Sequence, residues 1–425
     1  MGMYPGQYKI ESIKIGEEDI MGLFVSLEIF ENIFIPLVCG NIIFADTDGA
    51  GFVDENEIEF NEDFEFTLTN SQDEQLNFKG VLNGVASEQT SGTKKMYKVD
   101  FVSKEMRNND QMFISERFTQ TTPQDVISDM IERIEGTIEA TGDAGKPMEF
   151  VAGRWKPLHV LRYVLKHGVT GNASASNQDT SQEEEAKGTS GFLCWQAIGD
   201  GENPYRMCSV DDLISGVYEK HGPFENKMMM SGSTVEDDMK AVLDYAFDEM
   251  GDIQTKMKSG AFRCINVSFD MDTGLYKEYE YDASQEQGLM SEKQKKIVTK
   301  PTRVLFVPYT NDKFTKSCAK EADNTGDQSR ESIAQSNARQ NTFNDQTGSV
   351  TLYSHFGIHA GDIIDLKINK IISGESKGTT EDEKHSGKYA VKQVGHYFMS
   401  DGKAFTKITT IRSTTQTDTF TSEEA

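Results

Sequence analysis

The chain has 425 residues, and its 69 acidic against 43 basic residues give a formal net charge of −26. A chain this acidic repels nucleic-acid phosphates, so the composition argues against a protein that grips DNA or RNA. Aromatic residues make up 10% of the chain, too many for a disordered acidic protein, and the length allows about two to four domains.

The sequence predicts neither export nor a membrane span. Its N-terminal segment lacks the basic start and apolar middle of a signal peptide, and no apolar run approaches the roughly 20 residues of a membrane span. The cysteines are widely spaced and form no CxxC pair: Cys39, Cys194, Cys208, Cys264 and Cys318. This pattern favours folding in a reducing cytoplasm without disulfides or a zinc ribbon.

Alternating residues predict β-strands through the first hundred positions. Leu27 and Ile29 alternate with Ser26 and Glu28, and similar alternation recurs at 64–68 and 97–101. A period of two places one set of side chains on a buried face and the other toward solvent. With turn-rich segments between the runs and no helix, residues 1–104 are expected to form an antiparallel barrel or sandwich of about six strands.

Residues 105–214 read as a mixed α/β unit. Thr122 before Pro123 is typical of a helix N-cap, and apolar residues through Ile134 then fall on one face. A second helix is expected from Pro157, with Leu158, Leu161 and Leu165 turned inward, and a strand is expected over 192–198. The polar segment 171–190 between them is predicted to be a loop.

Residues 215–425 are expected to hold a second β region with helical and polar insertions. A capping-box spacing at Ser233 and Glu236 predicts a helix with a common face, ending at Gly251. That face comprises Met239, Val242, Leu243, Phe247 and Met250. Strands are predicted at 262–269, 303–307, 350–352, 364–368, 389–398 and 405–411.

Several polar stretches interrupt this last region. Residues 282–296 read as an exposed insertion, and 316–347 read as either a solvated helix or a flexible connector. Residues 413–425 are predicted to form a flexible tail.

One acidic segment matches the spacing of a calcium-binding EF-hand loop. Asp46, Asp48, Gly51, Asp54 and Glu57 occupy its positions 1, 3, 6, 9 and 12. However, the flanks alternate like strands, whereas an EF-hand has helices there, so a turn between two strands is the plainer interpretation.

No pattern in the sequence points to catalysis. His355 and His359 are four residues apart, which on a helix would place two metal ligands on one face, but Gly357 lies between them and a strand precedes them. There is no GxSxG, no P-loop and no GxGxxG after a strand. We therefore expect no enzyme activity, and no catalytic, metal or cofactor-binding residue is assigned.

The order of these elements resembles the baseplate hub proteins of contractile-tailed bacteriophages over nearly the whole chain. The resemblance is carried by segments 24–52 (FVSLEIFENIFIPLVCGNIIFADTDGAGF), 57–66 (EIEFNEDFEF), 118–134 (FTQTTPQDVISDMIERI), 191–198 (GFLCWQAI), 361–368 (GDIIDLKI), 386–398 (SGKYAVKQVGHYF) and 405–412 (FTKITTIR). It implies a mainly β fold in which two tail-tube-like β-barrel domains, 1–104 and 215–425, flank the mixed α/β domain 105–214. The insertions 171–190, 316–347 and 372–386 depart from a minimal hub.

The resemblance also implies a structural role in the virion. Three copies would form a ring of six near-equivalent units at the tail baseplate, assembled in the host cytoplasm, through which DNA passes. The implied partners are two further copies of the chain, tail-tube or tube-adaptor proteins, the central spike, and tape-measure and baseplate wedge proteins.

Two further hypotheses follow from the acidic residues. If they line such a ring, its wall would repel exiting DNA and let it slide. The alternative function is a calcium- or carbohydrate-binding β protein that uses the acidic loop 46–57.

Overall fold

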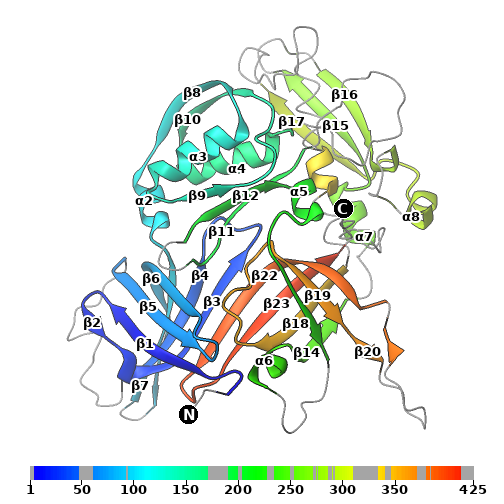
Figure 1. Ribbon diagram of the computed structural model, residues 1–425. Helices are drawn as coiled ribbons and strands as arrows, with labels where there is room; N and C mark the ends of the chain where they lie inside the picture. Colours follow the sequence, from blue (N-terminus) through cyan, green and yellow to red (C-terminus); the bar gives the residue numbers. More distant parts are fainter. Residues whose placement is uncertain are drawn as a thin grey trace.

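A computed structural model gives the fold (Figure 1). It describes residues 4–46, 61–91, 94–170, 190–199, 203–226, 234–248, 253–270, 274, 276–285, 290, 292–309, 334–339, 346–370, 380–382 and 384–412. No helix in these ranges is long and apolar enough to cross a membrane.

Most of the strands belong to one large sheet. Its thirteen strands are β1 (Tyr8–Ile15), β2 (Glu18–Asp19), β3 (Phe24–Asn32), β4 (Cys39–Asp46), β5 (Asp63–Asn70), β6 (Gln75–Ser91), β7 (Lys94–Ser103), β13 (Lys220–Glu225), β14 (Val242–Phe247), β18 (Gln346–Tyr353), β19 (Ile363–Lys367), β22 (Gly387–Met399) and β23 (Ala404–Arg412). The order is β14-β18-β23-β22-β3-β4-β7-β6-β5-β1-β2, with β19 also pairing with β22 and β13 pairing with β19.

The N-terminal strands, β1 to β7 with the short helix η1 (Met21–Leu23), form a curled antiparallel sheet, as the alternating pattern predicts (Figure 1). Its core is rich in phenylalanine. The rings of Phe64, Phe66, Phe78 and Phe101 are all buried, with centroids 4.7 to 6.5 Å apart. Such aromatic clusters supply much of the apolar burial in a small sheet.

The C-terminal strands curl into a second sheet that nearly closes on itself. Its order is β14-β18-β23-β22-β19-β13, and a parallel bridge between Glu225, at the end of β13, and Ala241, just before β14, brings the two ends together. Val350, Leu352 and Ile408 are fully buried inside it. The small hairpin β20 (Asn369–Lys370) and β21 (Thr380–Glu381) follows β19.

A mixed α/β part lies between the two curled sheets in sequence. Its elements are α2 (Glu105–Gln111), β8 (Ile114–Thr121), α3 (Pro123–Arg133), β9 (Ile138–Ala140), β10 (Met148–Trp155), α4 (Pro157–His167), β11 (Phe192–Gln196), β12 (Tyr205–Ser209) and α5 (Val210–Ser215). Thr122 caps α3 as predicted, since its hydroxyl accepts from the Asp125 amide at 3.2 Å. In α4 the buried residues are Pro157, Val160, Leu161 and Val164, and the predicted Leu158 and Leu165 are half-buried but pack against the same core. The inward face therefore includes the predicted leucines and is centred on Val160, Leu161 and Val164.

A third small unit contains β15 (Arg263–Asp270), β16 (Tyr276–Asp282) and β17 (Arg303–Tyr309) in the order β16-β15-β17. With it lie α7 (Ile253–Ser259), η3 (Ala283–Gln285), α8 (Glu292–Ile297) and a helical stretch at 334–339. Two predictions on polar segments are wrong here. Ala283 and Met290 are buried in this unit's core, so 282–296 is not simply an exposed insertion. Ala334 and Ala338 are also fully buried, so 334–339 is not a solvated helix.

The long helix predicted from Ser233 to Gly251 is also wrong in the described residues. Helix α6 (Val235–Met239) is short, its N-cap is Thr234, and the chain then enters strand β14. Strand β14 pairs with β18 from Val242 to Phe247, so hydrogen bonding to a distant strand outweighs the local helical pattern.

The observed fold confirms a mainly β protein with α/β insertions. The domain limits at 104 and 214 stay a prediction. The predicted features in 171–189, 310–333, 340–345, 371–379 and 413–425 lie outside the described residues.

Candidate assembly surface

The two curled sheets meet edge to edge at a seam between β3 and β22 (Figure 1). The antiparallel register runs from Asn32 opposite Gln393 to Ser26 opposite Met399. The Asn32 amide donates to Gln393 Oε1 at 3.1 Å across the seam. One continuous sheet therefore joins the N-terminal and C-terminal halves, which are not packed back to back.

One face of the sheet around this seam is turned away from the buried cores, and we call it the seam face. It comprises Glu28, Phe30, Asn32, Asn41, Ile43, Lys98, Asp100, Thr351, Tyr353, Gln393, Tyr397, Phe405, Lys407 and Thr409, all half-buried or exposed. Aromatic rings cross the seam, with Tyr397 lying 5.7 Å from Phe30 and 5.0 Å from Phe405. The face is thus a mixed polar and aromatic surface shared by both halves.

The charges on the seam face are balanced. Glu28 and Asp100 carry negative charge, and Lys98 and Lys407 carry positive charge. The large negative charge of the chain is therefore not concentrated on this part of the sheet.

Behind the seam, Glu31 of β3 is completely buried and fully hydrogen-bonded. Its carboxylate accepts from the amides of Ile198 at 2.8 Å and Ala360 at 2.9 Å, and it contacts His359 Nδ1 at 3.0 Å. Burial opposes ionisation, but the His359 imidazole and the amide donors outweigh it and lower the pKa of Glu31. Burial likewise opposes charge on His359, yet Glu31 raises the pKa of that histidine.

Asp362 forms a second buried anionic centre next to Glu31. Its carboxylate binds Arg206 Nη1 at 3.0 Å, His221 Nε2 at 3.0 Å and the His359 amide at 2.8 Å. These partners come from β12, from β13 and from the turn before β19. The network formed by Glu31, His359, Asp362, Arg206 and His221 therefore ties both curled sheets to the α/β part, and we call it the junction network.

Trp195 of β11 supports the same turn from the α/β side. Its indole Nε1 donates to the Ala360 carbonyl at 2.9 Å, and its ring is fully buried. Gly361 lies against this ring with φ at +92°, so the turn passes where a side chain would collide with the indole. Glycine is needed here both for the backbone conformation and for the space.

The two spaced histidines contact different partners. His355 Nε2 lies 2.8 Å from the Met239 carbonyl, whereas His359 contacts Glu31. No group of three or more potential metal ligands occurs among the described residues. Both histidines lie in the irregular segment that follows β18, not on a helix.

His396 of β22 is a buried histidine whose ionisation should make the stability of the protein depend on pH. It is 1% exposed, its Nδ1 contacts Thr406 Oγ1 at 3.1 Å, and burial lowers its pKa to about 4. Because protonation is disfavoured in the folded state, its stabilising contribution is complete above about pH 6.5 and is lost as the pH falls toward 4. The expected loss by pH 4.5 is about 2.5 kcal/mol.

The variant His396→Leu should therefore show a shallower fall in unfolding free energy between pH 7 and 4.5 than the wild type. Urea unfolding at several pH values measures this difference. Parallel curves for the two proteins would contradict a buried neutral imidazole.

The acidic loop is only partly described. Asp46 ends β4 opposite Lys95 and is 4% exposed, and the residues before it are strand, as the plainer interpretation expects. Asp48, Asp54 and Glu57 lie outside the described residues, so calcium binding there stays a prediction.

The cysteines in the described ranges, Cys39, Cys194, Cys208 and Cys264, are free thiols, and Cys318 lies outside those ranges. Burial raises the pKa of Cys194 and of Cys208, which favours the neutral thiol in both.

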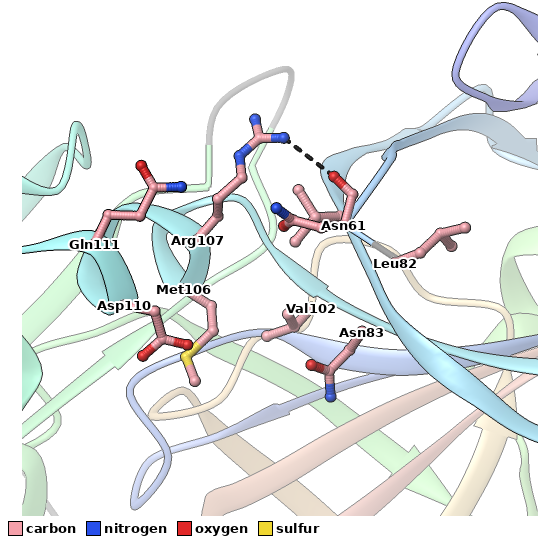
Figure 2. A pocket seen from close by; sticks show the side chains of 9 residues that line it. Asn61, Leu82, Asn83, Val102, Met106, Arg107, Asp110 and Gln111 are labelled. Atoms are coloured by element: carbon pink, nitrogen blue, oxygen red, sulfur yellow. Dashed lines mark hydrogen bonds between the residues drawn. The ribbon is translucent and has the colours of Figure 1, made fainter. Parts of the chain in front are cut away.

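A small pocket lies where the first curled sheet meets α2 (Figure 2). Its volume is about 250 Å³, and Leu82, Val102 and Met106 line it with polar residues that include Asp110. Arg107 spans one side by donating to the Asn61 carbonyl at 3.3 Å and to Asp63 at 2.9 Å. Drug-sized ligand sites usually exceed about 300 Å³, so this hollow suits a single side chain better than a cofactor.

Comparison with solved structures identifies the fold. The 43 kDa tail protein of prophage MuSo2 from Shewanella oneidensis aligns with 96% of this chain and 99% of its own length, at 8% identity and a TM-score of 0.52. A tail protein from Neisseria meningitidis MC58 aligns with 98% of this chain and all of its own, at 9% identity and a TM-score of 0.55. No protein-family model and no curated protein matches the sequence.

The chain therefore has the fold of phage tail proteins, which confirms the fold expected from the resemblance. Because the alignments extend over nearly all of both chains, the fold correspondence includes the two curled sheets and the α/β part together. Of the junction network, the sequence singles out His359 alone, and as a possible metal ligand; Glu31, Arg206, His221 and Asp362 carry no sequence motif. Glu31 could have been noticed, because it occupies an inward position in the alternation of Leu27 and Ile29.

Proposed function

We propose that this chain is a structural subunit of a phage-type tail, and that three copies form the hub ring of its baseplate. The observation that carries the proposal is the seam, because two curled sheets joined edge to edge already form an arc. The shared fold with the Shewanella and Neisseria tail proteins supports it.

Three such arcs would place six similar sheets around a channel. Closed rings are the usual outcome when one surface of a subunit binds a different surface of its neighbour. A hub of this kind would contact the sixfold tail tube or its adaptor on one side and the threefold spike on the other. Its role would be to connect these parts of the tail. This role fits a chain whose buried charged groups join separate parts of the fold.

In this arrangement the seam face would line the channel, because the opposite face of the sheet is covered by the cores. Its balanced charges do not support an acidic wall, so the hypothesis that acidic residues repel DNA in the channel is not carried further. Equal numbers of carboxylates and lysines would still leave few sites that hold phosphate strongly.

Mass measurement and imaging of the purified protein test the ring. At high protein concentration we expect a species of three times the 47.5 kDa chain mass, and negative-stain images of a threefold ring with a central opening. A dilution series separates weak trimers from stable monomers. A compact monomer at every concentration, with no opening in the images, would contradict the proposal.

A further inference from the structure

The small sheet of β16, β15 and β17 has one face covered by a core and one face that no described element covers. Cys264 of β15 and Tyr281 of β16 point into the core that α7 and the 334–339 helix complete. The other face, which we call the docking face, carries Ile265, Val267, Phe269, Tyr276, Glu278, Glu280, Val304 and Phe306. Val267 at its centre is only 6% exposed, whereas the residues around it are half-buried or exposed. The three strands form a sheet separate from the thirteen-stranded sheet and lie at the upper right of the molecule in Figure 1.

The docking face is unusually apolar for a surface. Val304 and Phe306 are each 62% exposed, Tyr276 is 56% exposed and Phe269 is 37% exposed. They are adjacent in register, since Phe269 is opposite Tyr276 and its ring lies 6.5 Å from that of Phe306. Single exposed apolar residues need no explanation, but a contiguous group with a polar edge marks an interaction surface.

The edge of the docking face is acidic. Glu278 is opposite Val267, and Glu280 is opposite Ile265, so both carboxylates flank the apolar centre. In the next row Arg263 and Asp282 form an ion pair at 2.7 Å and offset each other. Among the described residues, the two glutamates therefore give the docking face a net negative charge.

The charge of the docking face favours one kind of binding partner over another. A second copy bound through the same face would bring its own Glu278 and Glu280 against these two carboxylates, so like charges would oppose that contact. A polypeptide with apolar side chains flanked by lysine or arginine would match both features.

We propose that the docking face binds a different polypeptide, whose contact segment alternates apolar and basic residues. Burial of one phenylalanine side chain contributes about 1.5 to 3 kcal/mol, which corresponds to at least about tenfold in affinity. The inference goes beyond the ring, because the face takes no part in the seam.

Two labelled synthetic peptides test the proposal on the full-length protein. One alternates leucine and lysine, and the other alternates leucine and glutamate; fluorescence anisotropy measures their binding. We expect the lysine peptide alone to bind, and Phe306→Ser to weaken it about tenfold. Phe113→Ser, which alters a residue 60% exposed in the α/β part, is the matched control and should leave binding unchanged.

A second pair of variants separates local charge from total charge. The double variant E278Q/E280Q should weaken binding of the lysine peptide, whereas E17Q/E18Q, which removes the same charge from the exposed β1–β2 hairpin, should not. Equal effects of the two double variants would show bulk attraction and overturn the proposal. So would equal binding of both peptides, or self-association in sedimentation that Phe306→Ser abolishes.

Discussion

Replacing Asp362 by alanine should lower the free energy of unfolding by about 3 to 5 kcal/mol, the cost of breaking a buried ion pair by removing one partner. Asp362 is fully buried, and its carboxylate binds Arg206, His221 and the His359 amide. Without it, Arg206 would keep a positive charge that is only 13% exposed, close to the imidazole of His221. Urea unfolding at pH 7 measures the loss.

An exposed acid near the same histidine is the matched control. Glu219 lies 3.9 Å from His221, but its side chain is 77% exposed, so Glu219→Ala should cost less than about 1 kcal/mol. The double variant R206M/D362L should be more stable than Asp362→Ala, because it removes both charges together. If Asp362→Ala and Glu219→Ala had similar effects, the junction network would not be a main tie between the parts.

Replacing Gly361 by alanine should cost about 2 to 4 kcal/mol of unfolding free energy. Part of the cost is the backbone, since φ is +92° and residues with a Cβ avoid this region. The larger part is steric, because the new Cβ would overlap Cζ2 of the buried Trp195 ring. Thermal and urea unfolding of the purified variant measure the sum.

Gly402→Ala isolates the backbone part of that cost. Gly402 has φ at +80°, but no atom lies within 4 Å of its Cβ position, so we expect a loss of only about 1 kcal/mol. The loss of unfolding free energy in W195F/G361A should be smaller than the sum of the losses in the two single variants. Phenylalanine lacks the Cζ2 atom that the new Cβ would overlap. Simple additivity would contradict the overlap.

Local features of the fold could be predicted from the sequence. Period-two alternation found β3, β19, β22 and β23, and the Thr122–Pro123 pair found the start of α3. These signals are local, since they depend on the face that each residue presents and on one capping hydroxyl.

Pairing between distant segments could not be predicted. Nothing within β3 specifies β22 as its neighbour, and the segment 242–247 shows helical spacing although it pairs with β18. The 334–339 stretch was misjudged because its composition is polar, although Ala334 and Ala338 form a small apolar stripe at helical spacing. The junction network could not be predicted either, because its members come from five separate positions in the chain and only the fold brings them together.

The seam has a consequence for synthesis of the protein on the ribosome. Asn32 and Gln393 are 361 residues apart, so at about 5 to 20 residues per second the N-terminal sheet waits roughly 20 to 70 s for its partner strand. During that interval β3 presents unpaired amides and carbonyls, the kind of edge that recruits strands from other chains. The yield of correctly folded subunits should therefore depend on chaperones that shield nascent sheets. Truncated products that stop before β22 should aggregate.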